Sequence, residues 1–145
     1  MKGIHCIALA AFLVHAQGQA NEADIALGQQ WARCAQKAKI FSKASKGAEE
    51  AKKWKEIAAV HFIYAEAAMG SEAVQTEMLK TEADFAVSSA LTNKGTATAY
   101  LSSYSKQAAA DIDACVVSLG QHRSRFGTKV DQLLKEFKAR ASRPN

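Results

Sequence analysis

Residues 27–41 read LGQQWARCAQKAKIF, and large or small apolar side chains recur in this stretch at intervals of four and three residues. An α-helix has 3.6 residues per turn, so side chains with this spacing lie on one face of a helix. The recurring residues are Leu27, Trp31, Cys34, Ala38 and Phe41. No sustained alternation of polar and apolar residues and no Asn-Gly or Asp-Gly hairpin turn competes elsewhere in the chain. The stretch therefore decides the fold class, which we expect to be all-α.

The same periodicity continues outward from this stretch, and glycines separate its segments. The predicted helices span residues 22–45, 48–69, 72–91, 97–119 and a short stretch that begins after Gly127. Asn21 is expected to cap the first helix, and Gly120 is expected to end the fourth. Short connections favour antiparallel neighbours. We therefore expect an antiparallel up-down bundle of four long helices plus a short C-terminal helix.

The first 20 residues have the three parts of a cleavable secretion signal. Lys2 supplies a positive charge, residues 4–14 form an apolar run, and small residues follow at Ala16 and Ala20, either of which suits a signal peptidase. The apolar run is shorter than the roughly 20 residues that span a bilayer as a helix. The sequence predicts a periplasmic or secreted protein, with residues 21–145 as one helical domain that carries no transmembrane segment.

Two cysteines are left once the predicted signal is removed. Cys6 leaves with the signal, whereas Cys34 and Cys115 stay and lie on the apolar faces of their helices. An even pair of cysteines in an exported chain indicates a disulfide, and a bridge between these two would join the first and fourth helices. Two buried free thiols are the alternative.

The chain lacks the motifs of the common catalytic and cofactor sites. It contains no Gly-x-Ser-x-Gly, His-Glu-x-x-His, Cys-x-x-Cys-His or glycine-rich phosphate loop, so we expect no enzyme and no cofactor. The candidate ligand or metal residues are His61 and Glu66, which are close together on an alanine-rich stretch. A haem held by His61 or His122 with Met69 or Met78 stays open as an alternative.

Charge alternates in blocks along the chain, which has a net charge of +5. Seven lysines fall between positions 37 and 55, eight acidic residues between 56 and 113, and seven basic residues between 123 and 143. The last block is short, amphipathic and basic, which is typical of a surface for an acidic partner. Its candidate partner-binding residues are Lys129, Lys135, Lys138 and Arg140.

These patterns favour an exported, non-enzymatic helical binding or accessory protein. We expect a partner that is a protein or an acidic envelope component, with the inhibitor, immunity-type protein and assembly factor as examples. The predicted export signal argues against nucleic acid as the partner. The alternative function is a helical bundle that binds a small ligand, a metal or haem.

Overall fold

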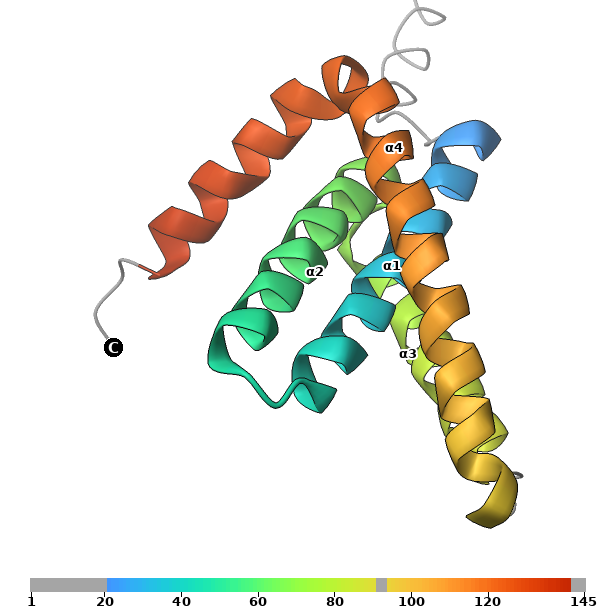
Figure 1. Ribbon diagram of the computed structural model, residues 1–145. Helices are drawn as coiled ribbons and strands as arrows, with labels where there is room; N and C mark the ends of the chain where they lie inside the picture. The colour runs from blue at the N-terminus through green and yellow to red at the C-terminus, as the bar shows by residue number, and fades with distance from the viewer. Residues whose placement is uncertain (1–20, 91–93, 142–145) are drawn as a thin grey trace, which may run out of the picture.

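The fold is known from a computed structural model, which describes the backbone of residues 21–90 and 94–141. The predicted secretion signal, residues 1–20, lies outside the described residues, and so does the side chain of Arg140. The described chain forms four helices, α1 (Glu22–Ala44), α2 (Ala48–Met69), α3 (Ser71–Ala90) and α4 (Lys94–Ala141) (Figure 1). No strand occurs in these residues, and the prediction of an all-α fold is confirmed.

Local chemistry fixes the ends of the first two helices. The side chain of Asn21 accepts a hydrogen bond of 2.8 Å from the backbone N–H of Asp24, which satisfies one of the free donors at the start of α1. Gly70 follows α2 with a φ of +87°, a backbone conformation that L side chains rarely adopt. Gly70 can therefore end α2 and let α3 begin at the next residue.

The prediction that Gly120 ends the fourth helix, with a separate short helix after Gly127, is wrong. α4 continues through both glycines as one hydrogen-bonded helix. Among the described glycines only Gly70 has a positive φ, so neither Gly120 nor Gly127 takes the left-handed conformation that ends a helix. Figure 1 shows instead that α4 bends sharply in this region. Pairs of glycine and serine residues are one of the common causes of sharp helix bends, and Ser118, Gly120, Ser124 and Gly127 lie in this region.

The bend divides α4 into a first arm, the residues before Gly120, and a second arm, the residues after Gly127. Figure 1 shows the second arm leaving the bend and running back along the same side of the molecule as α2. Residues from both arms contribute to the core, since Ile112 and Val130 are both buried. The bend therefore brings the start of the second arm, at Val130 and Leu133, against the body of the protein.

Trp31 of α1 lies at the centre of the core and is fully buried. Its ring packs edge-on against Tyr64 and Phe126, with centroid distances of 5.8 and 5.4 Å. His122 lies against a third side at 6.1 Å. The indole N–H donates a hydrogen bond of 3.2 Å to the hydroxyl of Ser118, so the polar atom of this buried side chain has a partner. Trp31 thus joins α1, α2 and α4.

Met69 of α2 packs directly against Gly28 of α1. A Cβ added there would lie 2.8 Å from Cγ of Met69, a distance that real side chains do not reach. The missing side chain of Gly28 therefore makes room for Met69 to pack over α1.

Candidate ligand-binding groove between α2 and α4

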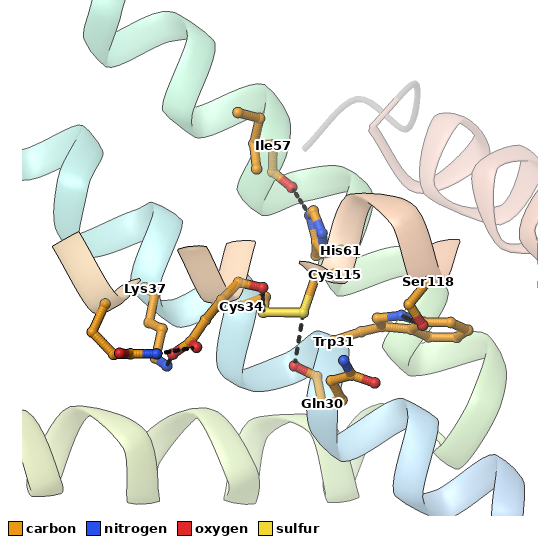
Figure 2. The surroundings of a disulfide bond; sticks show 10 residues. Gln30, Trp31, Cys34, Lys37, Ile57, His61, Cys115 and Ser118 are labelled. Atoms are coloured by element: carbon orange, nitrogen blue, oxygen red, sulfur yellow. Dashed lines mark hydrogen bonds and ion pairs between the residues drawn. A yellow bond between two sulfur atoms is a disulfide. The ribbon is translucent and has the colours of Figure 1, made fainter. Parts of the chain in front are cut away.

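A disulfide joins Cys34 of α1 to Cys115 on the first arm of α4, as predicted (Figure 2). The Cα atoms of the two cysteines are 6.6 Å apart, and both side chains are buried. An ion pair between Lys37 and Asp111 joins the same two helices. Burial raises the pKa of Asp111, but hydrogen bonds from Lys37 and Gln107 and the charge of Lys37 lower it more, so it lies below its ordinary value. The first arm of α4 is therefore held firmly to α1.

A second ion pair holds α4 to α1 at the bend. Arg125 pairs with Asp24 in the first turn of α1, and its guanidinium also lies 5.3 Å from the ring centroid of Phe126. α1 is joined to α3 by a further pair, in which Arg33 donates to Glu77 over 2.8 Å. Ion pairs therefore join α1 to both α3 and α4.

A groove with a volume of about 1080 Å³ runs between α2 and the two arms of α4. Its lining residues on α2 are Glu56, Ile57, Val60, His61, Ile63 and Tyr64. Those on α4 are Val116, Leu119, Gly120, Arg123, Ser124, Gly127, Val130, Asp131 and Leu134. The residues on α4 recur every three or four positions from 116 to 134, so one face of the helix supplies them all through the bend.

The walls of the groove are mainly aliphatic, and several of their side chains are open to solvent. Val60 is 48% exposed, Val116 is 50% exposed and Leu134 is 37% exposed. Exposure of large aliphatic side chains to water is unfavourable relative to their burial, and a contiguous set of them marks a binding site in many proteins. The groove therefore presents an apolar surface that a ligand can cover.

His61 lies at the base of the groove and is only 1% exposed. Its Nδ1 is 2.7 Å from the carbonyl oxygen of Ile57. A carbonyl can only accept, so Nδ1 carries the proton and Nε2 is left as an unprotonated acceptor. Nε2 is buried and has no hydrogen-bond partner. Figure 2 shows His61 among the residues that surround the disulfide.

Burial keeps this imidazole neutral. Desolvation lowers the pKa of His61 below its ordinary value, and the hydrogen bond to Ile57 opposes this only in part. At neutral pH the base of the groove therefore carries no charge. Any charge that a ligand meets in the groove comes from its rim.

The rim carries one basic and two acidic side chains, all exposed. Arg123 lies in the bend of α4, whereas Asp131 follows it by eight residues, or about two helical turns, on the second arm. Glu56 belongs to the N-terminal half of α2 and lies two turns before Tyr64. Within the part of the chain that the structure describes, Arg123 makes no ion pair with an acidic side chain.

The structure separates the other residues that the sequence suggested for ligand or metal binding. Glu66 is half-buried and has one oxygen atom without a partner, but it does not line the groove with His61. His122 packs against Trp31 and its Nδ1 lies 2.8 Å from the carbonyl oxygen of Ser118. Met69 covers Gly28 instead. In residues 21–90 and 94–141 no group of three or more His, Cys, Asp or Glu side chains could hold a metal ion.

The candidate partner-binding residues lie on the second arm. Lys129, Lys135 and Lys138 are exposed there, and they do not line the groove. Two large apolar side chains interrupt this basic surface, since Leu134 is 37% exposed and Phe137 is 39% exposed.

Comparison of the chain with protein-family models, with curated protein sequences and with solved structures gives no match. None of the described helices is both long enough and apolar enough to cross a membrane.

Sequence reasoning identified His61 but missed Arg123 and the groove itself. The groove exists because the bend turns the second arm toward α2, and Gly120 and Gly127 were interpreted as helix ends. The signal was present in the apolar positions 116, 119, 130 and 134, which keep the spacing of one helical face across both glycines.

Proposed function

We propose that this chain is an exported, non-enzymatic binding protein that holds a small, largely apolar ligand in the groove between α2 and α4. The observation that carries the proposal is the groove itself, with a volume of about 1080 Å³ and mainly aliphatic walls. Ligand sites in proteins are typically concave, apolar and about 300–1,000 Å³ in volume, and they often lie between helices.

The contacts that hold the walls of the groove favour a site that is preformed before a ligand binds. One wall is the first arm of α4, which the disulfide and the Lys37–Asp111 ion pair hold to α1. The opposite wall is α2, whose Tyr64 packs against the buried Trp31. A preformed site binds more tightly because little conformational entropy is lost on binding. We also propose that the helices follow the predicted antiparallel up-down order, in which each short connection returns the chain beside the previous helix.

A neutral fluorescent probe such as N-phenyl-1-naphthylamine tests the proposal. We expect saturable binding of one probe per chain. Val116→Glu places a charge in the wall and should weaken binding at least tenfold, because a carboxylate is costly to desolvate. Val117→Glu is the matched control, since Val117 is 61% exposed and does not line the groove. Absence of saturable binding, or equal loss in both variants, would refute the proposal.

A protein partner is the second candidate function, and the surface of the second arm favours it. Leu134 and Phe137 expose apolar surface beside Lys135 and Lys138, which suits a partner with an acidic rim and an apolar centre. Changing Lys135, Lys138 and Arg140 to Glu should abolish salt-sensitive binding to such a partner. Unchanged binding would exclude this surface.

The proposed compartment has a separate test. Expression of the full chain in a bacterial host, followed by mass measurement of the protein in the periplasmic fraction, should show a chain that begins at Asn21 or, for the earlier cleavage site, at Gln17. An unprocessed chain that stays in the cytoplasm would exclude export.

A further inference from the structure

We infer that the ligand of the groove is a single-chain amphiphile with a carboxylate head, that is, a fatty acid, with its head at Arg123 and its tail along the second arm of α4. This inference rests on the proposed function, because it names the chemical class of the ligand for the same groove.

The head group follows from the charge of Arg123. This side chain lines the groove at the bend of α4, and among the described residues it makes no ion pair. The neighbouring Arg125 is different, since it pairs with Asp24 and lies over Phe126. An arginine presents two parallel N–H groups that match the two oxygens of a carboxylate. The hydroxyl of Ser124, which lines the groove beside Arg123, can donate a further hydrogen bond.

The number of positive charges distinguishes a carboxylate from a phosphate. Among the described residues that line the groove, Arg123 is the only cationic one, because burial lowers the pKa of His61 and keeps its imidazole neutral. A phosphate head carries close to two negative charges at neutral pH and calls for a second cation. A single arginine balances the single charge of a carboxylate.

The acidic residues of the rim set the direction of the chain. Asp131 lies on the second arm, about two turns beyond Arg123, and Glu56 lies on the N-terminal half of α2. Both would repel a carboxylate, so the head is favoured at the bend and disfavoured at the far end of the groove. The far end offers aliphatic side chains for the tail, among them Val60, Val130 and Leu134.

Titration calorimetry with three ligands of equal chain length tests the inference, with the two anionic ligands below their critical micelle concentrations and the alcohol below its solubility limit. The ligands are dodecanoate, 1-dodecanol and dodecyl phosphate. We expect dodecanoate to bind with one molecule per chain and about tenfold more tightly than dodecanol, because a charge-assisted hydrogen bond is stronger than a neutral one. Shortening the carboxylate by one CH₂ should weaken binding about fourfold, since each buried CH₂ contributes a similar hydrophobic increment.

Two variants locate the head group. Arg123→Gln should weaken dodecanoate binding about tenfold and leave dodecanol binding unchanged. Lys129→Gln removes the same charge from the same helix at a position outside the groove lining, and it should change neither affinity. Circular dichroism of both variants should match the unmodified protein.

The outcomes separate this inference from the proposed function. Equal affinities for dodecanoate and dodecanol, with probe binding intact, would overturn the inference and leave the groove as a ligand site. Tighter binding of dodecyl phosphate than of dodecanoate would also overturn it, as would an equal loss in Arg123→Gln and Lys129→Gln. If neither the neutral probe nor any of the three amphiphiles binds, the proposed function itself is wrong.

Discussion

Removal of the disulfide should take away a large part of the stability of this protein. The perturbation is the double substitution Cys34→Ala and Cys115→Ala. The two cysteines are 81 residues apart in sequence, so the bond restricts a long loop of the unfolded chain. The chain-entropy relation for a loop of this length gives about 15 cal/mol/K, or about 4.5 kcal/mol at 25 °C. Most small domains have a total stability of only about 5–15 kcal/mol.

Urea unfolding followed by tryptophan fluorescence and circular dichroism measures this effect. With a slope of about 1–3 kcal/mol per molar urea, a loss of 4.5 kcal/mol lowers the midpoint by about 1.5–4.5 M. Both cysteines are buried, so alanine also removes apolar contacts of the two sulfur atoms. The unmodified protein with its disulfide reduced is the matched control, because it keeps both sulfur atoms and loses only the bond.

The disulfide should stabilise the protein by restricting the unfolded chain, and two results would contradict this. A reduced protein whose midpoint equals that of the oxidised protein would show that the bond restricts nothing that matters for stability. A double variant far less stable than the reduced protein would assign the loss to packing around Cys34 and Cys115 rather than to loop closure.

Three other predictions follow from buried groups. The free energy of unfolding, measured in urea, should be constant above about pH 6.5 and should fall as the pH drops toward the lowered folded-state pKa of His61, by at most about 1.4 kcal/mol per pH unit. The cause is that the unfolded chain takes up a proton on this histidine before the folded protein does, so His61→Gln should remove the slope. Gly28→Ala should be better tolerated in a Met69→Ala background than with Met69 present, because the contacts of 2.8 and 3.0 Å with Cγ and Sδ are then absent and only the 3.1 Å contact with the Cβ at position 69 opposes the gain in helix propensity of about 1 kcal/mol. Thermal melting of the single and double variants measures the difference, and an equal effect of Gly28→Ala in both backgrounds would contradict the prediction. Ser118→Ala should destabilise by about 1–3 kcal/mol in urea, because the indole N–H of Trp31 loses its acceptor inside the core; an unchanged midpoint would mean that water replaces the hydroxyl.

The first half of the fold could be predicted from local sequence. The predicted helices 22–45, 48–69 and 72–91 agree with α1, α2 and α3 to within one residue at each end. Their ends depend on neighbours in sequence, such as the cap at Asn21 and the left-handed Gly70. The disulfide was also predictable, since it needed only two cysteines on apolar helix faces.

The bend of α4 could not be predicted in the same way. A glycine costs a helix about 1 kcal/mol relative to alanine, which is small enough for tertiary packing to outweigh. Around Gly120 and Gly127, the packing of Phe126 against Trp31 and the burial of Val130 favour a continuous helix over a break. These contacts join residues about a hundred positions apart, so no local pattern reveals them. The groove and the proposed role of Arg123 depend on this bend and were missed with it.

The position of Trp31 has a consequence for the timing of folding. The groups that surround it arrive late, because Ser118 and Phe126 are made when most of the chain has already left the ribosome. Cys34 must likewise wait for Cys115 before it can be oxidised correctly. Contacts between distant residues slow folding and leave the nascent chain exposed until they form. The part of the core around Trp31 is therefore completed only after Phe126 has been made, so α1 and α2 lack these contacts during most of synthesis.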